Sequence, residues 1–336
     1  MVRYFLKRFI GLIIVVWAMT VVMFVVIRSI PGDPVAGMIG FGTPRFVIEA
    51  TREQLGLDKP LYQQYTSFLN DLAHGSLGYS IETRNPVATE MRDRFLVSAE
   101  LVLVSMLLGI PTGVILGIAA AANWREPTDG IIRFVSLLGA SAPLFWVALI
   151  FQLVFFRQLG WFPVDGRIDF AISLPPEVTG LLLVDSLLAG HFEAFKSAAQ
   201  HIFLPALALS LNSLGLLVRH TRASLLQVLN EDYVRTARSK GLSEYAVMLR
   251  HVLKNGAVPI VTELGLQFGI ILGSTFLVEI VFSWPGLGIY AVRGILNLDY
   301  PVVMGVALLF TFIYVVANFL VDLSYPLLDP RMKEDV

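Results

Sequence analysis

The chain alternates between long apolar stretches and polar connections, and this pattern predicts its helices directly. Six stretches are long and apolar enough, or nearly so, to cross a hydrocarbon layer of ~30 Å as helices. They cover residues 9–27, 101–122, 134–156, 202–218, 257–282 and 300–321. Two charged side chains, Glu263 and Glu279, fall inside these windows, and all others lie in the connections. Because an unpaired charge is costly in lipid, this distribution predicts an all-helical membrane protein with six transmembrane helices.

Composition indicates the same class. Of the 336 residues, 56% are hydrophobic and 15% are charged, and the mean hydropathy is +0.71. A soluble protein of this size could not bury so much apolar surface. The net charge of −1 provides no basic field for nucleic acid, and the lack of cysteine excludes disulfides and thiolate metal ligands. We therefore expect a chain surrounded by membrane lipid, with no nucleic-acid partner.

The distribution of Lys and Arg predicts the orientation. With the N-terminus inside, the inner segments carry 14 Lys and Arg in 72 residues, whereas the outer segments carry 11 in 135. Both termini are therefore expected in the cytoplasm. The first apolar run is longer than the ~7–15 residues of a secretory signal core, so we expect it to be retained as an anchor. The apolar run 178–190 contains Asp185 and is too short to span, which predicts a short helix on the outer face.

These spans divide the chain into four regions. We expect an N-terminal anchor helix, an extracytoplasmic cap region, a five-span core with a cytoplasmic loop at 219–256, and a cytoplasmic tail. The boundaries of the four regions are 1–30, 31–100, 101–325 and 326–336.

The cap region contains a predicted helix that begins near Leu61. Its apolar residues Tyr62, Tyr65 and Leu69 are spaced three and four apart and so share one face. This face fits two interpretations, which the sequence leaves open. It could bind an extracytoplasmic partner, or it could pack against the ends of the spans.

The inner loop 219–256 has the clearest local signals. Glu231 and Asp232 suit the start of a helix, Gly241 suits its end, and Ser243 suits the N-cap of a second helix. In the second helix we expect an amphipathic stripe of Tyr245, Met248, Leu249, Val252 and Leu253. The pattern predicts a short exposed helix joined by a tight turn to a helix that enters the membrane. A solvated charged loop is the alternative.

The segment 232–241, Asp-Tyr-Val-Arg-Thr-Ala-Arg-Ser-Lys-Gly, resembles the cytoplasmic loop of permease subunits in the dipeptide, oligopeptide and nickel branch of ABC importers. In the general motif of such permeases, Glu-Ala-Ala is followed three residues later by Gly. Here Arg235, Thr236 and Ala237 stand at the Glu-Ala-Ala places, before Gly241. Further stretches that are similar to this branch are 31–34, 55–60, 282–288 and 329–331. The similarity is strongest to the first permease subunit of dipeptide importers.

This resemblance implies a type I ABC importer permease in a bacterial inner membrane, with 101–325 as its permease core. It implies ATP-driven import of dipeptides or short oligopeptides. The expected partners are a second homologous permease subunit forming a heterodimer, two cytoplasmic ABC ATPases and an extracytoplasmic substrate-binding protein. ATP and magnesium would bind to the ATPases, and this chain would hold no cofactor or metal. Importers of nickel chelates or glutathione, and a stand-alone secondary transporter, are the alternative hypotheses.

The resemblance also assigns residues to roles. The residues expected to couple the chain to the ATPases are Glu231, Asp232, Arg235, Thr236, Ala237, Arg238, Lys240, Gly241 and Ser243. Glycines at four-residue intervals favour close helix packing, both at 109–117 and at 265–273. A second interpretation for Gly265, Gly269, Gly273 and Glu279 is that they lie along the translocation path. The sequence has no phosphate-binding loop and no catalytic motif, so we expect no enzyme activity in this chain.

Overall fold

The computed structural model describes residues 2–29, 44–54 and 56–328. The regular secondary structure in these ranges is helical, apart from one isolated β-bridge between Tyr79 and Pro86. The sequence stretches 31–34 and 329–331, and most of the predicted tail, lie outside the described residues. The chain divides into two compact units. The first comprises residues 1–12, 99–284 and 316–336, and the second comprises 13–98 and 285–315.

Five helices are long and apolar enough to cross a membrane. They are α1 (Val2–Ser29), α5 (Val87–Ala122), α9 (Phe192–Leu229), α12 (Ala257–Val281) and α14 (Tyr300–Leu328). Each coincides with one of the predicted windows, so five of the six spans are confirmed as continuous helices. Helix α9 extends well beyond its window at both ends, and the first eleven residues of the predicted inner loop therefore belong to α9.

The third predicted span, 134–156, is not one straight helix. It is divided into α6 (Pro127–Ser141), α7 (Leu144–Phe151) and the π-helix η1 (Gln152–Gln158). The two halves meet at an angle of 101°, and the six-span count holds if this bent pair is one span. Pro143 accounts for the break, because proline lacks an N–H and disfavours helical geometry in the preceding residue. Ala142 is accordingly extended, with φ −73° and ψ 134°.

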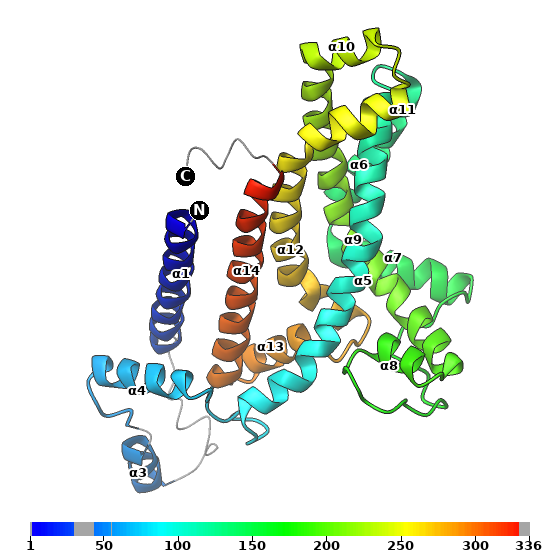
Figure 1. Ribbon diagram of the computed structural model, residues 1–336. Coiled ribbons are helices and arrows are strands. Elements are labelled where there is room, and N and C mark those ends of the chain that lie inside the picture. The colour runs from blue at the N-terminus through cyan, green and yellow to red at the C-terminus, as the bar shows by residue number, and fades with distance from the viewer. Residues whose placement is uncertain (1, 30–43, 55, 329–336) are drawn as a thin grey trace. The chain divides into compact units, whose positions relative to one another are not determined.

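In the first unit, α9 is the central helix, and α6, α7, α12 and the short helix α8 (Leu182–Leu188) pack against it. Figure 1 shows α6, α9 and α12 side by side. Helix α5 also contacts α9 closely. A Cβ atom added to Gly109, Gly113 or Gly117 would lie within 3.2 Å of side-chain atoms of α9. The 109–117 glycine stripe therefore packs helix against helix, because its residues leave room for the neighbouring backbone.

The connection before α9 is held together by buried carboxylates. Asp185 accepts hydrogen bonds from the backbone N–H and hydroxyl of Thr179 and from the N–H of Gly180. Glu100 accepts from Arg167 Nη2 and from the backbone N–H of Leu183, each at 2.7 Å. The predicted short helix in 178–190 is thereby confirmed as α8, and Asp185 stabilises the loop that precedes it.

The second unit contains α3 (Arg45–Gln54), α4 (Leu61–Ala73), the start of α5 and α13 (Leu287–Leu296). Helix α4 packs against α1, since Tyr65 Oη lies 2.8 Å from Thr20 Oγ1 and its ring meets Phe24 edge-on. Tyr62 is 68% exposed. The predicted apolar face of α4 is thus only partly packed, because Tyr65 contacts the first span whereas Tyr62 is exposed.

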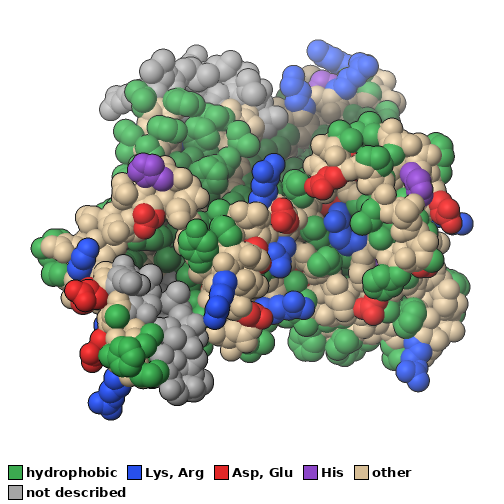
Figure 2. Space-filling view, turned by 90° about the horizontal axis from the view of Figure 1, so that it is seen from below, with side chains coloured by type: hydrophobic (Ala, Val, Ile, Leu, Met, Phe, Trp, Pro, Cys, Tyr) green, Lys and Arg blue, Asp and Glu red, His purple; other side chains and the backbone are tan. Residues whose placement is uncertain are grey.

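Helix α13 is fixed to the start of α5 in the same unit. Tyr290 Oη donates to Glu90 Oε2 at 2.7 Å, and the N–H of Leu287 donates to Ser98 Oγ at 2.8 Å. Figure 2 shows charged side chains of both signs interspersed with hydrophobic ones, with no broad patch of a single sign on the described part of this face.

Candidate functional site

The predicted exposed helix of the inner loop is α10 (Asp232–Ser239). Glu231 precedes it in an extended conformation and Lys240 follows its last turn, so both predicted ends are confirmed. Gly241 has φ +79°, and its N–H donates to the carbonyl of Arg238 at 2.9 Å. A Cβ atom at Gly241 would meet nothing within 4 Å. The requirement for glycine therefore comes from the left-handed backbone conformation alone.

The second predicted helix follows at once but has an irregular form. Ser243 Oγ accepts the N–H of Ala246 at 3.3 Å, which confirms the predicted cap. The three-residue helix α11 (Glu244–Ala246) continues as the π-helix η2 (Val247–Leu253), and α12 begins at Ala257. A short and nearly continuous helical segment therefore joins the Ser243 cap to the transmembrane helix α12.

The amphipathic stripe predicted for this second helix is only partly correct. Met248 and Val252 are buried as expected, whereas Tyr245 is 76% exposed and Leu249 is also exposed. Val247, which the stripe omits, is fully buried. Residues five apart share a face in a π-helix, whereas the prediction assumes spacings of three and four. The five-residue interval from Val247 to Val252 therefore lines the buried side.

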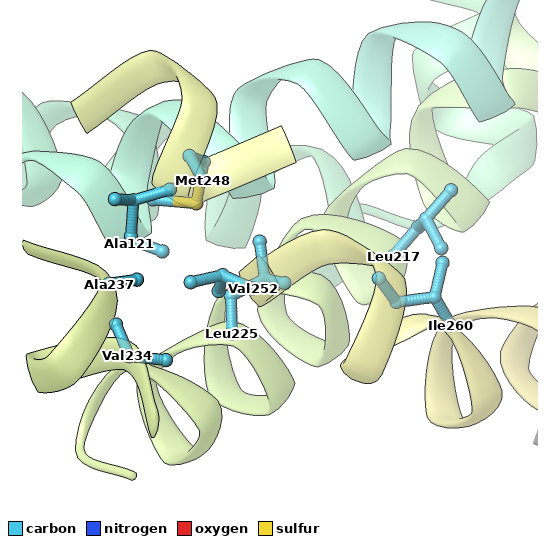
Figure 3. Packing of buried hydrophobic residues seen from close by; sticks show 9 residues of the cluster. Ala121, Leu217, Leu225, Val234, Ala237, Met248, Val252 and Ile260 are labelled. Atoms are coloured by element: carbon cyan, nitrogen blue, oxygen red, sulfur yellow. The ribbon is translucent and has the colours of Figure 1, made fainter. Parts of the chain in front are cut away.

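One hydrophobic cluster joins α10 to the ends of the long helices. Figure 3 shows Val234 and Ala237 of α10 beside residues from α5, α9 and η2, whereas Ile260 of α12 lies at the other end of the cluster, next to Leu217. The buried members are Ala121, Leu217, Leu225, Val234, Ala237, Val247, Met248, Val252 and Ile260. Since α10 is packed into this cluster, it cannot move as a loose loop. A displacement of α10 would be transmitted to the helices whose ends share the cluster.

The predicted coupling residues fall into two groups. All except Ala237 are exposed, whereas Ala237 is 5% exposed and packs into the cluster. Arg238 makes a bidentate pair with Glu244, with Nε–Oε1 at 2.9 Å and Nη2–Oε2 at 3.1 Å. This pair bridges the turn around Gly241. Sequence reasoning missed the role of Glu244, because the two residues are six apart and no helix spacing connects them.

The residues on α12 that are predicted to lie along the translocation path differ in their surroundings within this chain. A Cβ atom at Gly265 would lie 2.9 Å from Val321 of α14, whereas one at Gly273 would meet nothing within 4 Å. Gly269 is half-buried, and Glu279 is fully buried. Gly265 is therefore a helix-packing glycine, and Gly273 lies on an exposed face.

A polar cluster within the apolar helices includes Glu263, one of the two charged residues inside the hydropathy windows. Gln267 Nε2 donates to Glu263 Oε1 at 2.6 Å, and His220 Nδ1 of α9 lies 3.4 Å from Glu263 Oε2. Glu263 and Gln267 are both buried. His220 gave no signal in the sequence because it comes from a different helix. Over the ranges that the structure describes, no group of three or more His, Asp or Glu residues is arranged to hold a metal ion.

Comparison with known proteins identifies the family. Residues 113–334 match the family described as the binding-protein-dependent transport system inner membrane component, and residues 1–102 match the family described as the N-terminal part of the membrane component of such systems. The di/tripeptide transport system permease protein of Pseudomonas aeruginosa (strain UCBPP-PA14) is 42% identical over 332 residues, which cover 98% of both chains.

Two further relatives span nearly the whole chain. The dipeptide transport system permease protein of Alkalihalophilus pseudofirmus is 38% identical over 333 residues, covering 99% of this chain and 100% of that one. The glutathione transport system permease protein of Escherichia coli O6:H1 is 37% identical over 334 residues, covering 99% of both. The chain therefore belongs to the family of binding-protein-dependent transport system inner membrane components, and it is a multi-pass permease of the bacterial inner membrane with the type I ABC importer fold.

Proposed function

We propose that this chain is a permease subunit that imports dipeptides or short oligopeptides, driven by ATPases that dock on α10. The observation that carries the proposal is the hydrophobic cluster that Val234 and Ala237 of α10 share with α5, α9 and η2, and that continues to the start of α12. A docked protein that moves α10 would move these helices with it. Membership of the family supports a transporter of several subunits, because members of this family work with a separate binding protein.

The coupling residues would act in two ways. The exposed side chains of 231–243 would contact an ATPase, and Ala237 would hold α10 against the other helices. Gly241 and the Arg238–Glu244 pair would set the angle of the turn. An ATPase pair that closes on ATP would pull α10 and open the path to the outside. Hydrolysis would then return the path to the inside.

The remaining parts of the proposal draw on the relatives and on the distribution of Lys and Arg. Relatives named for dipeptides, di/tripeptides and glutathione support a short peptide as substrate, with glutathione as the alternative. A second permease subunit, two ATPases and an extracytoplasmic binding protein would complete the transporter, with both termini of this chain in the cytoplasm. ATP and magnesium would be bound by the ATPases.

The test is a mild-detergent purification of the tagged full-length chain from its native membrane. Recovery of a second permease and of ATPase subunits, with vanadate-sensitive ATP hydrolysis, is the expected result. Arg235→Glu reverses a charge on the exposed side of α10 and should reduce the recovered ATPase, whereas Arg157→Glu on η1 is the matched control. A lone chain that transports peptides in liposomes would overturn the proposal.

A further inference from the structure

Helices α6 and α9 enclose a groove of about 600 Å³. The two helices are antiparallel, because Arg222 pairs with Asp129, Gly215 contacts Ser136, and Gly139 lies opposite Leu211. Between antiparallel helices, the two residue numbers of each contacting pair have a nearly constant sum, as they do here. Arg133 and Arg219 have nearly the same sum, so they lie at the same level on opposite sides of the groove. Both residues line it.

The groove carries a net positive charge at this level. Its lining includes Arg133, Arg219 and Arg222 but no acidic side chain. Asp129 lies behind Arg222 and is bound to it through two hydrogen bonds of 2.7 Å. Arg222 is thereby paired, so the remaining positive charge of the lining is that of Arg133 and Arg219, which are both exposed. Arg219 Nη2 lies 3.4 Å from His220 Nε2 on the same helix.

The rest of the groove is apolar. Phe134 and Leu137 of α6 are 63% and 64% exposed, and they adjoin the two arginines on the side of the apolar window. Gly215 lies where the two helices touch, because a Cβ atom there would clash with the backbone oxygen of Ser136, so α6 and α9 approach closely beside the groove. Arginines at the end of an apolar helix lie at the depth of lipid headgroups. The lining thus changes from cationic to apolar at the edge of the predicted spans 134–156 and 202–218, where the headgroup region is expected.

We propose that this groove binds an anionic phospholipid. Its phosphate would lie between Arg133 and Arg219, and one acyl chain would follow the apolar wall formed by Phe134 and Leu137. Charge complementarity selects this occupant, because basic pockets between transmembrane helices favour anionic headgroups over neutral ones. The proposal does not depend on which solute the permease imports.

The test measures binding of fluorescent phosphatidylglycerol to the purified full-length chain, with its accompanying subunits, in phosphatidylcholine nanodiscs. Arg133→Gln and Arg219→Gln should each weaken binding about fivefold, since each removes one cation near the headgroup. Arg157→Gln on η1 removes an exposed charge outside the groove and should leave binding unchanged. Equal affinities for all three variants would overturn the proposal.

A second variant tests whether lipid binding depends on the space in the groove as well as on its charge. A side chain at Gly130 would meet nothing within 4 Å, so Gly130→Leu narrows the groove beside the arginines without disturbing the helix contact. It should reduce lipid binding although all three arginines remain. Because the chain has no cysteine, Gly130→Cys can also carry a single photo-crosslinker. Crosslinking to lipid supports the site, whereas crosslinking to another protein subunit shows that protein covers the groove and overturns the proposal.

Discussion

Arg222 of α9 donates two hydrogen bonds to Asp129 of α6, from Nε to Oδ1 and from Nη2 to Oδ2, both at 2.7 Å. Asp129 is 3% exposed. The planar guanidinium matches both carboxylate oxygens, so the pair fixes the rotation of α6 against α9 as well as their distance. It lies in the last turns of α9, close to the connection with α10.

Asp129→Ala should destabilise the chain by about 3 kcal/mol, because it leaves Arg222 without its buried counter-charge. Thermal unfolding of the purified protein in detergent measures the change. The double variant Asp129→Leu with Arg222→Met replaces the pair by apolar side chains and should recover most of the loss. A double variant as unstable as the single one would contradict this account.

Gly241→Ala should reduce peptide uptake with little loss of folded protein. The left-handed backbone at Gly241 costs about 1 kcal/mol or more with an alanine side chain, so the turn after α10 would shift. We expect ATP hydrolysis to persist and to become poorly coupled to uptake, and Gly241→Asp should show the same effect more weakly, because Asp tolerates the left-handed conformation better than Ala. The ratio of solute imported to ATP hydrolysed measures it.

Gly11→Ala is the matched control for Gly241→Ala. Gly11 is in α1, where no left-handed backbone is involved and an added Cβ atom meets nothing within 4 Å. Its coupling ratio should equal that of the unaltered protein. Normal uptake by Gly241→Ala would exclude a role for this turn in coupling.

Gly117→Ala should destabilise the contact between α5 and α9 by about 1–3 kcal/mol. The added Cβ atom would lie 2.5 Å from Thr221 Cβ, so one helix has to move. Gly130→Ala adds the same atom to a helix with open space around it and should not destabilise. Denaturation of both variants in the same detergent compares the two, and equal stabilities would show that α5 and α9 are not so closely packed.

The loop before α8 should lose stability in acid. Burial tends to raise the pKa of Asp185, but the hydrogen bonds from Thr179 and Gly180 outweigh it and hold that pKa below its ordinary value. The unfolded loop therefore takes up a proton at a higher pH than the folded loop does. The stabilisation is complete near neutral pH and is lost as the pH falls below about 4.

Amide hydrogen exchange in residues 179–190 between pH 7 and pH 3, corrected for the intrinsic exchange rate, measures this loss. Asp185→Asn cannot ionise, so its protection should be lower at neutral pH and should change less with pH. Asp169→Asn, which alters a more exposed carboxylate in the same connection, is the control. The same pH dependence in Asp185→Asn as in the unaltered chain would refute the assignment.

Local sequence signals were sufficient for a large part of this structure. Apolar runs located five continuous spans, and short-range capping rules located both ends of α10 and the Ser243 cap. The residues of the stretch 232–241 also indicated the family, and the comparisons with known proteins confirm it. These features depend on residues within a few positions of one another, where spacing and conformational preference already decide the outcome.

Other features depended on contacts between distant segments. Pro143 accounts for the break between α6 and α7, but the 101° bend depends on how the two helices pack on α9. Asp129 and Arg222 are 93 positions apart, and His220 meets Glu263 from another helix. The π-helical turn of η2 buries Val247 in place of Tyr245. The sequence by itself determined which segments are helical and membrane-spanning, whereas only tertiary packing decided their partners, because side chains far apart in the chain lower their free energy jointly.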